Sequence, residues 1–170
     1  MNPESGNLEV WTHSLDPMRA TVRVRLPWPL EPAAEVRGRL MGPRCRFATT
    51  VEVAYPFRQM EPSVYAAVIP EPSLWEPGCP FLYEGPIECS LGGNVIQRAW
   101  VRHCLRTTKM GAHGFLLNGK PFVVRPVQPV EGTEAELLEL RGQGFNALQG
   151  DASAELRELA DRIGFLVMSH

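Results

Sequence analysis

The sequence predicts an α+β protein in which a seven-stranded, immunoglobulin-like β-sandwich is followed by a βαβαβ unit. Short segments with period-two alternation, separated by proline and glycine, occupy the chain up to about residue 106. After Arg125, apolar residues recur at helical spacing. A strong hairpin signal, Asn118-Gly119, lies between the two patterns. We therefore predict a sandwich over residues 7–110 and a βαβαβ segment over residues 111–170.

The first part of the chain contains seven strand candidates. They are residues 8–13, 20–26, 35–40, 49–53, 64–69, 82–90 and 95–105. The second candidate is the clearest, since Val22, Val24 and Leu26 share one face, as in a strand with one face buried. Seven short strands in about 100 residues are typical of an immunoglobulin-like sandwich.

The joint between the two patterns is a predicted β-hairpin. Asn118-Gly119 suits a type I′ turn, in which both central residues need a positive φ. The run that follows, Phe122-Val123-Val124, is apolar without alternation, which is typical of a strand covered on both faces. We expect this run to be the first parallel strand.

Two helices and two further strands are expected after the joint. Thr133 followed by Glu136 forms a capping box for the first helix, and Gly142 and Gly144 end it. The second helix should begin near Asp151 or Ser153 and stop at Gly164. The remaining strands are predicted at residues 145–148 and 165–168, both parallel to the first.

Composition excludes several classes of partner and site. The net charge of -2 and the pI of about 6.1 give no reason to expect binding to nucleic acid or to an anionic membrane. The N-terminus lacks the pattern of a signal peptide, and no apolar run is long enough for a membrane span, so we expect a cytoplasmic protein. Cys45, Cys79, Cys89 and Cys104 show no metal-ligand spacing and are expected to be reduced thiols. No metal site and no cofactor are predicted.

Three motifs, in order, resemble the family-two glycoside hydrolases, which include β-galactosidases, β-glucuronidases and β-mannosidases. They are Leu74-Trp-Glu-Pro-Gly-Cys-Pro-Phe-Leu-Tyr83, Gly114-Phe-Leu-Leu-Asn-Gly-Lys-Pro-Phe-Val-Val-Arg125, and Gly144-Phe-Asn-Ala-Leu148 with Leu159-Ala-Asp-Arg-Ile-Gly-Phe-Leu-Val167. The resemblance implies that the βαβαβ segment is the beginning of the catalytic (β/α)8 barrel of that family. Such a barrel takes about 250 residues, so the chain would hold only its first three strands.

The resemblance also implies that the chain has no catalytic residues of its own. Retaining glycosidases use two carboxyls about 5–5.5 Å apart, and the family's two glutamates lie on later barrel strands. No Asn-Glu pair occurs in the sequence. The chain is thus expected to be related to carbohydrate metabolism but inactive alone. The alternatives are a split glycosidase completed by a partner chain and a carbohydrate-binding or interaction module.

Candidate substrate-binding residues follow from the ends of the expected strands, where barrel chemistry resides. After the first strand the resemblance preserves only Arg125, while Gln128 stands near positions that contact substrate in the family. After the second strand the chain has Gln149 and Asp151. Trp28, among prolines, is the tryptophan expected to be exposed and able to stack on a sugar, whereas Trp75 and Trp100 lie in core patterns.

The predicted partners are a carbohydrate and a second polypeptide. Three strands from a closed barrel leave unpaired edges and an uncovered inner face. We therefore expect self-association or a partner chain at this open face.

Overall fold

The computed structural model describes residues 8–129 and 131–168, which form two compact units. Unit 1 contains the described residues of Met1–Pro43, Val51–Ser73 and Tyr83–Leu105. Unit 2 contains those of Arg44–Thr50, Leu74–Leu82 and Arg106–His170. Two segments that lie inside the predicted sandwich in sequence are therefore part of unit 2. Asn7, Ser169 and His170, at the ends of the predicted domains, lie outside the described residues.

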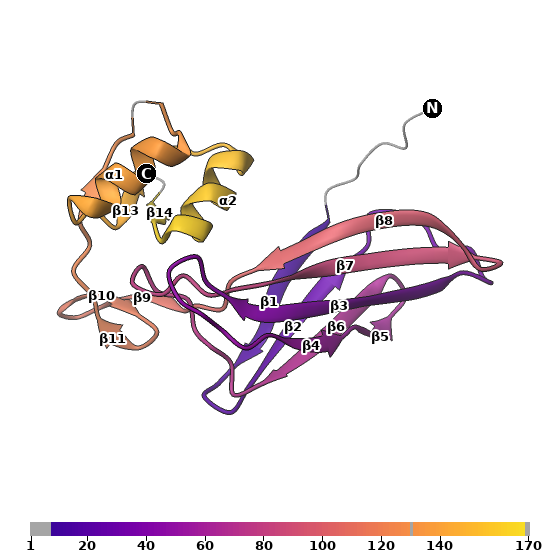
Figure 1. The fold of residues 1–170 in the computed structure, drawn as a ribbon. Coiled ribbons are helices and arrows are strands. Elements are labelled where there is room, and N and C mark those ends of the chain that lie inside the picture. Colours follow the sequence, from indigo (N-terminus) through magenta and orange to yellow (C-terminus); the bar gives the residue numbers. More distant parts are fainter. Residues whose placement is uncertain (1–7, 130, 169–170) are drawn as a thin grey trace. The chain divides into compact units, whose positions relative to one another are not determined.

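Unit 1 contains two four-stranded antiparallel sheets, drawn as two layers in Figure 1. The first has the order β1-β2-β6-β5 and the second the order β4-β3-β7-β8. The strands of the first sheet are β1 (Glu9–Leu15), β2 (Arg19–Arg25), β6 (Val64–Pro70) and β5 (Arg58–Glu61). Those of the second are β4 (Val53–Pro56), β3 (Glu35–Arg44), β7 (Leu82–Leu91) and β8 (Asn94–His103).

The described residues of unit 1 thus form eight strands, whereas the sequence analysis predicted seven. Strand β5 was missed because all four of its residues are exposed, so its sequence carries no apolar alternation. The fourth predicted strand, residues 49–53, is displaced, since β4 begins at Val53. The other six candidates each overlap an observed strand, and the predicted alternation of β2 is confirmed, because Val22 and Val24 are fully buried.

A small three-stranded sheet in unit 2 contains the predicted hairpin. Its order is β11-β10-β9, with β9 at Thr108–Gly111, β10 at Gly114–Leu117 and β11 at Lys120–Pro121. Leu117 pairs with Lys120, and the turn residues Asn118 and Gly119 have φ values of 52° and 75°. Both are positive, as a type I′ turn requires. The hairpin prediction is confirmed.

The apolar run Phe122-Val123-Val124 is not the buried strand that the sequence predicts. Strand β11 ends at Pro121, the Phe122 N–H makes one further hydrogen bond to the Phe115 carbonyl of β10 at 3.0 Å, and Val123 is 72% exposed. The first parallel strand instead begins at Pro126. Phe122 packs edge-on against Phe115, with ring centroids 6.3 Å apart. Phe122 therefore packs across the hairpin, a contact that the periodicity of the sequence does not predict.

The C-terminal part of unit 2 has the predicted order β-α-β-α-β. Strands β12 (Pro126–Val127), β13 (Ala147–Gln149) and β14 (Leu166–Met168) form a parallel sheet in that order. Helices α1 (Glu134–Gly142) and α2 (Ala154–Ile163) connect them (Figure 1). The described part of the chain is therefore α+β, mostly strands with two short helices.

The predicted helix ends are confirmed. The Thr133 side chain accepts a hydrogen bond from the Glu136 N–H at the start of α1, and Ser153 accepts one from Leu156 at the start of α2. Gly164 ends α2 in the left-handed region at φ 99°. The helices and sheet enclose a core whose fully buried members include Leu137, Ile163 and Phe165.

Among the described residues, no helix combines the length and the apolar character that crossing a membrane would require.

Candidate functional site

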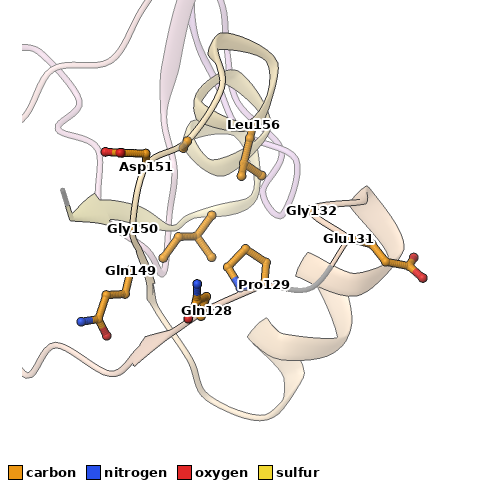
Figure 2. A pocket seen from close by; sticks show the side chains of 10 residues that line it. Gln128, Pro129, Glu131, Gly132, Gln149, Gly150, Asp151 and Leu156 are labelled. Carbon is orange, nitrogen blue, oxygen red and sulfur yellow. The ribbon is translucent and has the colours of Figure 1, made fainter. Parts of the chain in front are cut away.

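A cavity of about 190 Å³ lies at the C-terminal ends of β12 and β13 in unit 2 (Figure 2). Gln128 and Pro129, which follow β12, contribute to its lining, as do Gln149 at the end of β13 and Asp151 beyond it. Ligands of parallel α/β sheets bind outside the carboxyl ends of the strands. The cavity therefore occupies the edge of the sheet at which a ligand is expected.

Parallel pairing explains why distant side chains meet here. Val127 is in register with Leu148 in β13, so the residues after both strands emerge at one edge. The Gly150 N–H then donates to the Met168 carbonyl in β14 at 3.0 Å, which fixes the loop after β13. Gly150 has a φ of 110°, a backbone conformation that residues with a side chain rarely adopt.

A second loop of the cavity is held by the start of α1. The carboxylate of Glu136 accepts hydrogen bonds from the N–H groups of Glu131 at 3.0 Å and Gly132 at 2.7 Å. In a standard capping box this carboxylate would bond the N-cap N–H. Here it reaches further back along the chain and fixes the loop that contributes Glu131 and Gly132 to the cavity.

The cavity wall between the two helices is apolar. Leu148 is 2% exposed, and Leu156 of α2 also contributes to the lining. A Cβ atom at Gly132 would lie 3.3 Å from the Leu156 side chain, and Gly132 has a φ of 66°. Glycine at this position therefore allows the loop to approach the helix closely.

The two carboxylates of the cavity do not converge. Figure 2 shows Asp151 and Glu131 on opposite sides, with their carboxylates pointing away from each other. Retaining glycosidases need two carboxyls about 5–5.5 Å apart around one bond. Among the residues that the structure describes, none with a basic side chain lines the cavity. The cavity is thus suited to hydrogen bonding with a neutral polar molecule rather than to binding an anion.

Arg125 lies apart from the other predicted site residues. It precedes β12, at the edge of the sheet opposite the cavity. Its main-chain N–H donates to the side-chain oxygen of Asn146 at 2.7 Å, and a Cβ atom at Gly144 would be 3.3 Å from its guanidinium. The structure therefore brings together Gln128, Gln149 and Asp151 but not Arg125.

Trp28 is in unit 1 and is only partly exposed. Its indole nitrogen is buried and has no hydrogen-bond partner within the described part of the chain. Trp75 is fully buried, as expected, but Trp100 is 52% exposed, which corrects its assignment to a core pattern. The missed signal is the period-two alternation that places Trp100 on the same strand face as Arg98 and Arg102.

Sequence reasoning also missed the lining residues Glu131 and Leu156. No local signal identifies either as part of a cavity, because both approach it only when the two loops fold over the sheet edge. Among the described residues, no group of three or more His, Cys, Asp or Glu side chains could hold a metal ion.

The fold is that of one part of the family-two glycosyl hydrolases. A family-two member from Bacteroides cellulosilyticus aligns with a TM-score of 0.70 at 22% identity, covering 98% of this chain and 24% of that chain. A β-glucuronidase from Bacteroides uniformis aligns with a TM-score of 0.66 at 19% identity, covering 95% and 22%. An FMN-binding β-glucuronidase from Facaelibacterium prausnitzii L2-6 aligns with a TM-score of 0.71 at 15% identity, covering 97% and 28%.

These likenesses confirm, at the level of the fold, the resemblance to family-two glycoside hydrolases that the three motifs indicated. The chain spans about a quarter of the length of the solved structures that it matches. No protein-family model and no curated protein sequence matches it.

Proposed function

We propose that this chain is a glycoside-hydrolase-like protein whose cavity binds a neutral sugar and which does not hydrolyse glycosides by itself. In this proposal unit 1 is the immunoglobulin-like sandwich and β12 to β14 are the first strands of a (β/α)8 barrel. One observation carries the binding function. Gln128, Gln149 and Asp151, predicted from the sequence as sugar contacts, line one cavity at the C-terminal edge of the parallel sheet.

The chemistry of these side chains suits hydroxyl groups. Each glutamine amide offers two donors and an acceptor, and an ionised aspartate offers acceptors only. Sugar hydroxyls both donate and accept, so these groups can pair with the hydroxyls of a bound sugar. The volume of about 190 Å³ is below the roughly 300–1,000 Å³ of pockets for drug-sized ligands. A single sugar ring therefore fits better than an oligosaccharide.

The charge of the lining favours a neutral sugar over a glucuronide. Glu131 and Asp151 contribute two carboxylates, and no lining residue within the described ranges is basic, so a sugar carboxylate would be repelled by like charges. Several structural neighbours are β-glucuronidases. The neutral sugar proposed for this chain therefore differs from the glucuronides that the names of these neighbours indicate.

Absence of hydrolysis follows from the arrangement of the same two carboxylates. A retaining mechanism requires an ionised nucleophile and a protonated acid directed at one glycosidic bond. The divergent directions of Glu131 and Asp151 (Figure 2) do not provide such a pair.

Binding is tested by titrating the protein with galactose, glucose, mannose and glucuronate under NMR observation. We expect saturable shifts at Gln149 and Gly150 with at least one neutral sugar, a millimolar Kd, and weaker binding of glucuronate. Gln149→Ala should weaken binding roughly tenfold, since one good hydrogen-bonding group is removed. Gln143→Ala is the matched control, because Gln143 contacts Glu139 at the end of α1 and does not line the cavity. Absence of saturable shifts with every sugar would overturn the binding proposal.

Hydrolysis is tested separately with aryl β-galactoside, β-glucoside, β-mannoside and β-glucuronide over one day. We expect no release above background. Release that survives further purification and falls in Glu131→Gln or Asp151→Asn would show that these carboxylates do catalyse.

We also propose that the parallel sheet associates with further strands from a second polypeptide or a second copy. Within the described residues, β12 and β14 are edge strands with one hydrogen-bonded neighbour each. Unpaired edges favour such pairing. Light scattering at tens of micromolar should show a species larger than a monomer, and a strict monomer would contradict this part of the proposal.

A further inference from the structure

Two cysteines that are far apart in sequence meet in unit 2. Cys45 lies in the segment Arg44–Thr50 and Cys79 in the segment Leu74–Leu82. The thiols of Cys45 and Cys79 are neighbours, since the Cys45 side chain is among the groups that raise the pKa of the Cys79 thiol. Both residues are free cysteines and both are partly exposed, so a small molecule can reach them.

Arg141 in α1 holds both segments in place. Its guanidinium donates to the main-chain carbonyls of Pro77 and Gly78, which immediately precede Cys79. The same guanidinium lies over the ring of Phe47, 4.1 Å from the centroid, and Phe47 donates its main-chain N–H to the sulfur of Cys45 at 3.4 Å. One cation thus contacts both cysteine segments.

The segment of Cys45 has a second attachment to the same helix. Arg46 forms an ion pair with Glu134 at the start of α1, while Arg141 lies near its end. Both cysteine segments are therefore attached to helix α1 by arginine contacts that do not depend on the thiols. A disulfide requires an S–S bond of about 2.05 Å and suitable Cβ positions. Neighbouring thiols held on segments that attach to one helix need only a rearrangement of the side chains to reach it.

We propose that Cys45 and Cys79 are a site of reversible oxidation, at which a small-molecule disulfide such as glutathione disulfide converts the thiol pair into an intramolecular disulfide. The Cys45 thiolate attacks one sulfur of glutathione disulfide, forming a mixed disulfide and releasing one glutathione thiolate. The Cys79 thiolate then attacks the Cys45 sulfur and releases the second glutathione thiolate. The two protons lost by the protein thiols are taken up by the released thiolates, so the protein loses two electrons and glutathione disulfide gains them.

The order of these steps follows from the surroundings of Cys79. Burial raises the pKa of the Cys79 thiol, and the neighbouring Cys45 and the carboxylate of Glu76 raise it further. A raised pKa lowers the thiolate fraction at neutral pH, and the thiolate is the nucleophile. Cys79 is therefore a poor first nucleophile and acts as the resolving thiol.

The test is to incubate the native chain with excess glutathione disulfide and then identify the linked peptides by mass spectrometry after blocking free thiols. We expect the four cysteines to yield two free thiols and one Cys45–Cys79 crosslink that dithiothreitol reverses. The midpoint of thermal unfolding should rise by about 5 °C, since the crosslink restricts the unfolded chain.

Three variants separate the roles of the thiols. Cys79→Ala should accumulate glutathione on Cys45, Cys45→Ala should react several-fold more slowly, and Cys104→Ala, the matched control, should form the crosslink like the native chain. Circular dichroism verifies that each variant is folded. Retention of four thiols in the folded native chain, a crosslink between other cysteines, or a stable mixed disulfide at Cys45 in the native chain would overturn the proposal.

Discussion

The indole nitrogen of Trp75 donates a hydrogen bond to the main-chain carbonyl of Asp161 at 2.8 Å, which joins the loop Leu74–Leu82 to helix α2 within unit 2. The guanidinium of Arg106 lies over the same indole, 4.3 Å from the ring centroid, and pairs with the Asp161 carboxylate at 2.7 Å. The main-chain carbonyl of Trp75 accepts a hydrogen bond from the Asn118 side chain at 2.9 Å. One fully buried residue therefore connects a loop, a helix and the turn of a hairpin.

Trp75→Phe should destabilise the protein by about 2–3 kcal/mol. The smaller ring leaves a cavity and removes the donor to the Asp161 carbonyl. Urea unfolding monitored by circular dichroism measures the change. Trp100→Phe is the control, because Trp100 is 52% exposed and its replacement should change stability by less than about 0.5 kcal/mol. Equal effects of the two substitutions would contradict the role assigned to Trp75.

Gly164→Ala should destabilise the protein by roughly 2 kcal/mol or more. The φ of 99° is unfavourable for alanine, and the added Cβ would lie 2.5 Å from the Pro77 carbonyl oxygen and 2.6 Å from the Arg141 guanidinium. Gly142→Ala is the matched control, since a Cβ there meets nothing within 4 Å and helix propensity favours alanine. Its stability should be unchanged or higher by up to about 1 kcal/mol, as measured by urea unfolding. A neutral Gly164→Ala would show that the loop and helix can separate easily.

Glu136→Ala should loosen the cavity as well as helix α1. The substitution leaves the N–H groups of Glu131 and Gly132 without their carboxylate acceptor, at an expected loss of about 1–2 kcal/mol. Amide hydrogen exchange should accelerate at residues 131–132. Glu139→Ala is the control on the same helix, because the exposed Glu139 carboxylate accepts a hydrogen bond from the Gln143 side chain and not from the cavity loop. Unchanged exchange at Gly132 would show that the loop is held by other contacts.

Glu155 should titrate below the ordinary pKa of glutamate. Its own main-chain N–H and the hydroxyl of Ser153 stabilise the carboxylate and lower its pKa. The resulting stabilisation is fully present above the unfolded pKa of about 4.3 and is lost as the pH falls through the lower folded pKa. Ser153→Ala should raise the pKa of Glu155 toward its ordinary value, whereas Ser153→Thr should retain the shift. A carboxyl NMR titration measures both, and an identical pKa in the two variants would contradict the role of the hydroxyl.

Local sequence determined the features of this protein that depend on a few adjacent residues. The Asn118-Gly119 turn, the N-caps Thr133 and Ser153, and the end of α2 at Gly164 all follow from φ preferences or from a side chain bonding a nearby main-chain group. The predicted parallel order of the strands also placed Gln128, Gln149 and Asp151 at or just after strand ends. In the structure these three residues line one cavity.

Tertiary structure decided the features that depend on contacts between distant segments. Val123 is exposed although its sequence context predicts a buried strand. The inclusion of Arg44–Thr50 and Leu74–Leu82 in unit 2 depends on Arg141, Trp75 and the groups that they contact. Periodicity reports which residues can share a face, but it does not state which distant segment will cover that face. For this reason the meeting of Cys45 and Cys79 could be found only in the folded chain.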